Sequence, residues 1–303
     1  GYLNLFKYSR YPERKLIKIN TIQHYLSMSG IRITVSDVSS AAAKVQELHH
    51  LPALTAVIMG KILAGTSVLA TDFKNHEGIS ILWQTNSILG SIHADAYEGY
   101  FIRGYVDTAD DNLPVTSHNE KLLISDKAQL TVTRYSLVRT PYSSRINLSF
   151  GNISECLGQY LKQSDQIKSF IFVTAAVSPE KKITRAAGIF AQLLPEGNKK
   201  KFTQYFRNRN HLFSKEGLFQ GHELETLIKE GGFSIIKEAP VAFCCTCSEE
   251  RIKTALVALP KSERVSLLKD EYIEISCHYC GKIRKISRET LQHWFQKEGS
   301  ITQ

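Results

Sequence analysis

Two cysteine-containing segments determine the expected fold of the C-terminal part of this chain: Phe243-Cys244-Cys245-Thr246-Cys247-Ser248 and Cys277-His278-Tyr279-Cys280-Gly281. Two close cysteine pairs can converge into a tetrahedral site of four thiolates, the usual geometry of structural zinc. Gly281 suits the tight turn that follows such a pair. The predicted ligands of one Zn²⁺ per chain are therefore the four cysteines of the two pairs, Cys245, Cys247, Cys277 and Cys280.

The region around these pairs holds few large apolar side chains. Ser248, Ser262 and Ser287 are placed to cap three short helices, and isoleucines between residues 273 and 286 indicate a small pair of strands. A module of about 60 residues with so little core usually needs a metal or a disulfide to stay folded. We expect a zinc ion to supply this stabilisation.

The same cysteines predict sensitivity to oxidation. Thiolates bound to zinc remain nucleophilic, so an oxidant can attack them, release the metal and remove the folding energy that it supplied. The Cys277–Cys280 pair has the spacing of redox-active dithiols, whereas a disulfide between Cys245 and Cys247 closes a small, strained ring that is more easily reduced. The module therefore has the composition of a redox switch.

Two other side chains have simpler interpretations. His278 could replace a thiolate, but four cysteines already complete the coordination shell, so we expect it to be exposed. Cys156 lies on the apolar face of a predicted helix over residues 153–164 and is expected to be a small buried hydrophobic side chain.

The rest of the chain is typical of a soluble protein. Its 303 residues suggest about two domains, and 43% hydrophobic with 22% charged residues is ordinary for a globular chain. The apolar stretch 51–73 is interrupted by Lys61 and Asp72, which favours a buried core helix over a membrane span. The N-terminus lacks the pattern of a signal peptide, so a cytoplasmic location is expected.

The order of patterns along the chain predicts three regions. Strand-like segments at 79–83, 91–95 and 129–133 alternate with helical ones up to about residue 194. Short helical pieces separated by glycines follow. We expect a mixed α/β (α+β) core domain in residues 1–195, a helical linker in residues 196–240 and a small α+β zinc-binding domain in residues 241–303.

Positive charge is concentrated near the linker. The net charge is +9, and the span from Lys181 to Lys215 holds nine basic residues and one acidic residue, with aromatic side chains among them. Three interpretations stay open: a solvated helix face whose aromatics pack on the core, a surface that binds unfolded protein, or a surface that binds RNA. A zinc-ribbon nucleic-acid-binding protein that uses residues 181–215 is the alternative function.

An enzyme is not expected. Catalytic zinc needs an open coordination position, and four cysteine ligands leave none. The sequence also lacks a Gly-x-Ser-x-Gly nucleophile motif and a phosphate-binding loop of the Gly-x-x-x-x-Gly-Lys type.

With its cysteine pattern, the chain resembles a known family, the redox-regulated holdase chaperone heat-shock protein 33, or 33 kDa chaperonin. The resemblance continues upstream, in the right order, through Ile92-His93-Ala94-Asp95-Ala96, Arg103-Gly104-Tyr105-Val106, Tyr160-Leu161-Lys162-Gln163-Ser164-Asp165-Gln166 and residues 187–195. It therefore covers most of the chain.

This resemblance implies an ATP-independent chaperone of the stress response that is inactive when reduced and zinc-bound. Oxidation would pair Cys245 with Cys247 and Cys277 with Cys280, release zinc, unfold the C-terminal module and destabilise the linker. An apolar surface would then bind unfolding client proteins and prevent their aggregation, and the oxidised protein would form a homodimer through its N-terminal domain.

Three features depart from the family pattern. Cys244 directly precedes the first pair, where it could act as a substitute ligand or form a mispaired disulfide. Ala187 stands in place of one of two glycines, and the strong positive charge is unusual for the family. These departures concern the linker surface and the choice of clients rather than the four predicted ligands.

Overall fold

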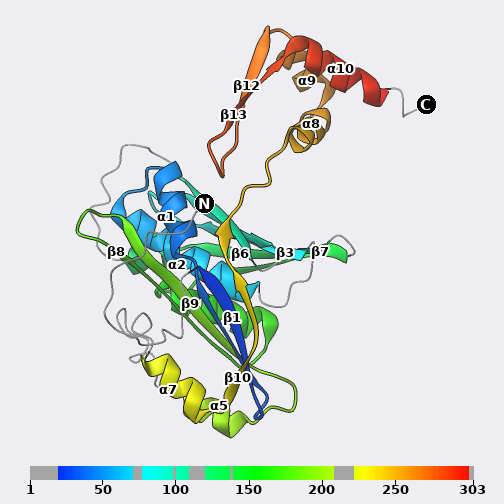
Figure 1. The fold of residues 1–303 in the computed structure, drawn as a ribbon. Coiled ribbons are helices and arrows are strands. Elements are labelled where there is room, and N and C mark those ends of the chain that lie inside the picture. Colours follow the sequence, from blue (N-terminus) through cyan, green and yellow to red (C-terminus); the bar gives the residue numbers. More distant parts are fainter. Residues whose placement is uncertain are drawn as a thin grey trace, which may run out of the picture.

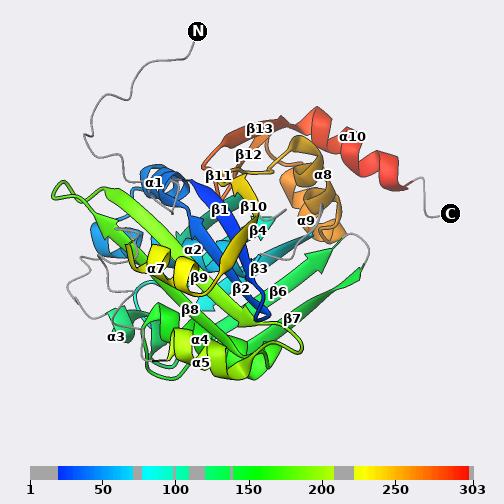
Figure 2. The same cartoon turned by 60° about the horizontal axis from the view of Figure 1, so that its bottom comes forward.

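The computed structural model describes residues 20–70, 77–97, 100–108, 120–136, 139–207 and 222–299. Figure 1 shows a large body of sheets and helices, with a smaller C-terminal module (orange and red) that extends from one end of it. Figure 2 shows the same module on one side of the body, next to β11.

The first sheet of the body has five antiparallel strands in the order β10-β1-β2-β9-β8. Its central strands are buried on both faces, because helices cover each side of the sheet. The strands are β1 (Thr21–Ser27), β2 (Ile31–Asp37), β8 (Ser169–Val177), β9 (Ile183–Leu193) and β10 (Phe233–Pro240).

The second sheet has six strands in the order β11-β5-β4-β3-β6-β7. All its pairs are antiparallel except the short parallel pair of β11 with β5. The strand-like segments noted in the sequence fall within β3, β4 and β6. The strands are β3 (Glu77–Gln84), β4 (Ser91–Tyr97), β5 (Phe101–Asp107), β6 (Gln129–Ser136), β7 (Arg139–Asn147) and β11 (Ala242–Phe243).

Helix α2 (Ala53–Leu69) lies between the two sheets and contacts strands of both. It is apolar around most of its circumference, as a helix inside a protein core must be. The buried core helix expected in the stretch 51–73 is therefore confirmed, although residues 71–73 lie outside the described residues. Among the helices that the structure describes, none is long and apolar enough to cross a membrane.

Three shorter helices complete the body: α1 (Ser39–Leu48), α3 (Glu120–Ser125) and α4 (Ile153–Tyr160). Helix α4 continues into one π-helical turn, η1 (Leu161–Asp165), as the helical spacing over 153–164 indicates. Cys156 lies on its inner face at 1% exposure, and burial raises the pKa of its thiol to about 12. The expectation of a small buried side chain is confirmed.

The segment expected to be a helical linker is helical only in part. Helices α5 (Lys199–Phe206) and α7 (His222–Glu230) agree with the expectation, but residues 233–240 form strand β10 and pair with β1. Gly231 and Gly232 end α7, where Gly232 adopts a left-handed φ of +61° that favours glycine. These glycines mark a helix-to-strand turn rather than an unstructured connection.

The aromatic side chains of the basic segment pack on the body. Phe202 and Phe206 of α5 are buried against the outer face of the first sheet, while Lys199, Lys200 and Lys201 are exposed. Within the described residues, this supports a solvated basic face over buried aromatics. Several residues of this segment and its neighbours lie outside the described residues, namely Arg209, Phe213, Lys215, Gly217 and Gly221.

The C-terminal module is built around a small core of Ile286, Leu291 and Trp294. Ser248 and Ser287 accept hydrogen bonds from backbone N–H groups at the starts of α8 and α10, as predicted. Ser262 is not a cap, because α9 begins at Lys261, directly after a proline. The module comprises α8 (Glu249–Val257), α9 (Lys261–Leu267), β12 (Tyr272–Ser276), β13 (Ile283–Ser287) and α10 (Arg288–Gly299).

The packing of α5 predicts a local loss of stability in the variant Phe206→Ala. Removal of this buried ring costs about 3 kcal/mol, so the amides of α5 should exchange with solvent roughly 100-fold faster. Hydrogen exchange in the central strand β3 should not change. The matched control is Gln204→Ala on the exposed side of the same helix, and equal α5 protection in the two variants would contradict this packing.

Candidate metal centre

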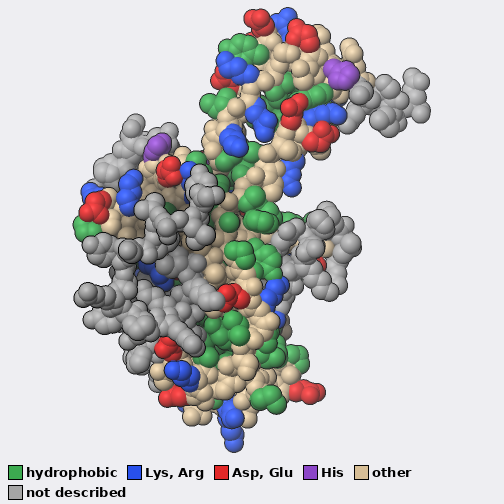
Figure 3. Space-filling view, in the orientation of Figure 1, with side chains coloured by type: hydrophobic (Ala, Val, Ile, Leu, Met, Phe, Trp, Pro, Cys, Tyr) green, Lys and Arg blue, Asp and Glu red, His purple; other side chains and the backbone are tan. Residues whose placement is uncertain are grey.

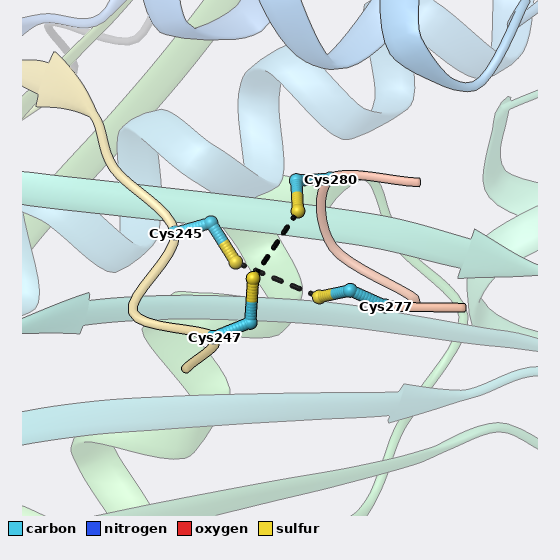
Figure 4. Close-up of side chains that lie close together, drawn as sticks. All are labelled: Cys245, Cys247, Cys277 and Cys280. Carbon is cyan, nitrogen blue, oxygen red and sulfur yellow. Dashed lines mark hydrogen bonds between the residues drawn. The ribbon is translucent and has the colours of Figure 1, made fainter. Parts of the chain in front are cut away.

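The four predicted ligands come from two loops that meet at the base of the module. Cys245 and Cys247 lie between β11 and α8, and Cys277 and Cys280 lie in the turn between β12 and β13. Figure 4 shows the four sulfur atoms pointing toward one common centre. The structure therefore brings together all four residues that the spacing singled out.

The distances between sulfur atoms fit a tetrahedral metal site. The Sγ atoms of Cys245 and Cys277 are 3.6 Å apart, those of Cys247 and Cys280 are 3.5 Å apart, and all four lie within 4.8 Å of one another. A tetrahedron with metal–sulfur distances of about 2.3 Å has edges of about 3.8 Å. All six cysteines of the chain are free thiols, so these four are available to bind an ion such as Zn²⁺.

The two side chains considered as substitute ligands lie outside this set. Cys244 and His278 are not among the residues whose ligand atoms converge. His278 is exposed, as expected, and its ring lies beside Tyr105 with centroids 5.5 Å apart. The backbone carbonyl of Cys244 accepts a hydrogen bond from the hydroxyl of Tyr97 at 2.7 Å.

The turn that carries the second pair depends on Gly281. Its N–H donates to the carbonyl of Cys277 at 2.8 Å, and its φ of +67° lies in the left-handed region. A Cβ atom at this position would have nothing within 4 Å. The requirement for glycine is therefore conformational rather than steric.

The environment separates the thiols by acidity. Burial opposes ionisation of Cys277, but hydrogen bonds from the backbone N–H groups of Cys280 and Tyr279 outweigh it and lower the pKa of this thiol to about 7. Burial raises the pKa of Cys280 to about 12 and also raises the pKa of Cys245. Cys277 is thus the most acidic of these three thiols, and a bound cation would favour the thiolate form of all of them.

Comparison with known proteins identifies the family. Residues 20–287 match the sequence profile of the family described as Hsp33 protein, which covers most of the chain. This chain belongs to the Hsp33 family. The resemblance that the cysteine pattern and the upstream segments indicated is therefore confirmed.

Curated relatives in this family are named 33 kDa chaperonin. The protein of Streptococcus equi subsp. zooepidemicus is 27% identical over 84% of this chain and 91% of its own length. That of Streptococcus pneumoniae is also 27% identical, over 88% of this chain and 95% of its own length. Hsp33 proteins are chaperones rather than enzymes, which confirms that expectation and supports a chaperone function for this member.

A solved structure agrees in fold. The crystal structure of the 33 kDa chaperonin from Thermotoga maritima superposes with a TM-score of 0.79 and covers 93% of this chain and all of the other. The sequence identity is 23%, so the likeness supports the mixed α+β architecture of this Hsp33 chain and nothing finer.

In this Hsp33 chain, the cysteine loops lie against polar residues of the second sheet. Asp95 of β4 and Arg103 of β5 are directly paired across the sheet and form an ion pair of 2.8 Å. Arg103 also contacts Thr246 and Tyr279, the residues inside the two loops. The roles of Asp95 and Arg103 could not be predicted from the sequence; the available signal was one acidic and one basic residue in neighbouring strand-like segments.

The left-handed turn predicts weaker metal binding in Gly281→Ala. Placing an alanine at this φ costs about 1 kcal/mol, which corresponds to roughly fivefold weaker zinc binding. Asparagine tolerates this conformation better, so Gly281→Asn should lie between alanine and the wild type. Competition with a chromogenic chelator measures the affinities.

Gly158→Ala is the control for this series. Gly158 lies in helix α4, and a Cβ at this position makes only ordinary contact with Ile171 of β8. It should bind zinc as the wild type does. An alanine at position 281 with wild-type affinity would show that the turn does not need glycine.

Proposed function

We propose that this chain is an ATP-independent holdase chaperone that is inactive when reduced and zinc-bound and is activated by oxidation. The observation that supports this most strongly is the convergence of four free thiols from two separate loops in a module with a very small core. A bound zinc ion would supply the positive charge that holds the four thiolates together. Membership of the Hsp33 family supports the chaperone part of the proposal.

The activating step is the oxidation of both cysteine pairs. Within each pair, two thiolates lose two electrons to form one sulfur–sulfur bond, and one peroxide takes up those electrons with two protons to give water. Following the family pattern, the bonds are Cys245–Cys247 and Cys277–Cys280. Hypochlorous acid is an equivalent two-electron oxidant. Four thiolates are then no longer available as ligands, and the metal leaves.

We infer that unfolding of the module reaches the body through the segment that precedes it. The loop of Cys245 follows directly after β11, whose pairing with β5 ends in a hydrogen bond from the Cys244 N–H to the Ile102 carbonyl. Before β11 comes the edge strand β10, and before that α7 and α5, which cover the apolar outer face of the first sheet. Loosening of this segment would uncover apolar surface for unfolding client proteins.

The division of labour follows the three regions expected from the sequence. We propose that residues 1–195 bind clients and dimerise when the chain is oxidised, that residues 196–240 transmit the change, and that residues 241–303 are the switch. A reducing cytoplasm would keep the thiols free and the chaperone inactive until oxidative stress arises.

A nucleic-acid-binding function remains the second candidate, because Lys199, Lys200 and Lys201 form an exposed basic turn at the start of α5. This function predicts affinity for an oligonucleotide that falls steeply with salt and does not depend on oxidation while zinc stays bound. Binding that appears only after oxidation would not support it.

The ligand assignment predicts the behaviour of Cys277→Ser and Cys280→Ser. Each variant loses one of four ligands, so its zinc affinity should fall by more than the roughly 100-fold that loss of an outer-shell partner costs. Suppression of light scattering from a thermally unfolding client enzyme should then no longer depend on peroxide treatment.

The matched control is Cys156→Ala, which removes a thiol that is buried in the body. It should keep zinc and require oxidation for activity. Full zinc affinity together with normal redox control in Cys277→Ser or Cys280→Ser would show that the metal site is wrongly assigned.

A further inference from the structure

A single arginine of the second sheet contacts both cysteine loops at their middle residues. The Arg103 Nη1 donates to the Thr246 hydroxyl, which lies between Cys245 and Cys247, at 3.1 Å. The guanidinium carbon of Arg103 lies 3.9 Å from the ring centroid of Tyr279, which lies between Cys277 and Cys280. This distance is well within the range of a cation–π contact.

Arg103 is itself held in place by Asp95. Its Nε and Nη2 donate to one carboxylate oxygen of Asp95 at 2.9 and 2.8 Å, and the two side chains are 14% and 6% exposed. One edge of the guanidinium therefore binds the sheet, one nitrogen binds the first loop, and the flat face binds the second loop. A lysine has neither the planar face nor the fixed set of donors to make all three contacts.

Among the residues of the C-terminal module, Tyr279 makes several contacts with the body besides that with Arg103. Its ring meets the ring of Tyr105 edge-on with centroids 4.8 Å apart, and Tyr105 in turn stacks on His93. His49 lies just after α1, and its Nε2 forms a hydrogen bond with the Tyr279 carbonyl oxygen at 3.1 Å. Burial and the nearby carboxylate of Asp95 raise the pKa of the Tyr279 hydroxyl, so this ring is neutral. None of these contacts involves a sulfur atom.

We propose that Arg103, positioned by Asp95, is the docking point through which the N-terminal body recognises the metal-bound state of the switch. Thr246 and Tyr279 belong to loops far apart in the sequence. They reach the same guanidinium only when the loops lie side by side, as they do when four sulfurs share one centre. A disulfide within each loop ties that loop to itself and leaves the two loops unconnected, so Arg103 cannot hold both.

The consequence is a direct restraint on the segment that leads into the body. Cys244 lies between Arg103's partner Thr246 and strand β11, and its carbonyl is bound by Tyr97 of β4. Docking of the loops therefore keeps β11 paired with β5. The inference deepens the proposed function, because it takes zinc as the ion that joins the loops.

The test measures whether the module moves with the body in the reduced, zinc-loaded full chain. In the wild type, ¹⁵N relaxation should give the same rotational correlation time for residues 249–296 as for the sheets. In Tyr279→Ala the module should tumble with a shorter correlation time than the body while one zinc per chain remains bound. This variant leaves the pair of Asp95 and Arg103 intact, so the sheet should stay folded.

Arg103→Met should uncouple the module from the body in the same way. In Arg103→Lys the two should tumble together only in part. Tyr279→Phe keeps the ring over Arg103 but loses the hydroxyl that interacts with Asp95, so its module should stay docked more fully than that of Tyr279→Ala. The control for loss of an arginine is Arg145→Met on β7, whose side chain binds Thr131 on the same sheet away from the loops. It should leave the module docked.

Three results would overturn the proposal. The module could tumble with the body in both Tyr279→Ala and Arg103→Met, the Arg145→Met control could release the module as well, or both test variants could lose zinc, which would place these residues in metal binding rather than docking. No client or oxidant enters this experiment. Failure of the proposed function would show instead as an oxidised wild type that cannot suppress client aggregation.

Discussion

The arrangement of the two cysteine loops depends on four sulfur atoms that are far apart in the sequence and share one centre in space. In its described residues, the C-terminal module has three fully buried core side chains, Ile286, Leu291 and Trp294, with partly buried hydrophobic side chains around them. This is a small core for about 50 ordered residues. In the proposed function, the free energy of metal binding contributes to the folding free energy of this module. Under that proposal, a chemical change at the sulfurs is also a change in fold.

The body contrasts with the module in how it is stabilised. Helix α2 is buried between two sheets, whereas the segment that joins body and module packs with the buried side chains of α5 and α7 on one outer face only. In β10, Phe233 is buried but Ile235 and Ile236 are half exposed, so this edge strand depends mainly on its ladder with β1. In Figure 3, patches of hydrophobic side chains (green) lie down the middle of the body, on the side where β10 runs in Figure 1. The strand that precedes the cysteine loops is thus an edge strand with little buried apolar surface of its own.

The sequence predicts the metal centre better than it predicts the surroundings of that centre. The convergence of Cys245 with Cys280 could be predicted because cysteine pairs at such spacings in a reducing compartment are typical of metal sites and redox groups, and both uses bring the thiols together. Strand β10 was missed because both its faces are largely exposed, which removes the alternation that marks a strand, and because Gly231 and Gly232 resemble a linker. The contact of Arg103 with Tyr279 depends on where the module rests on the sheet, and single charged residues in strands carry no periodic signal for that.

The most direct test of the account is a peroxide titration of the wild type that records zinc release and client light scattering in the same samples. The account predicts that zinc appears in a chromogenic chelator at the same oxidant concentration at which suppression of aggregation begins, and that reduced, zinc-loaded protein does not suppress it. Suppression by the reduced, zinc-loaded protein, or release of zinc without any gain of suppression, would contradict the coupling of the thiolate site to chaperone activity.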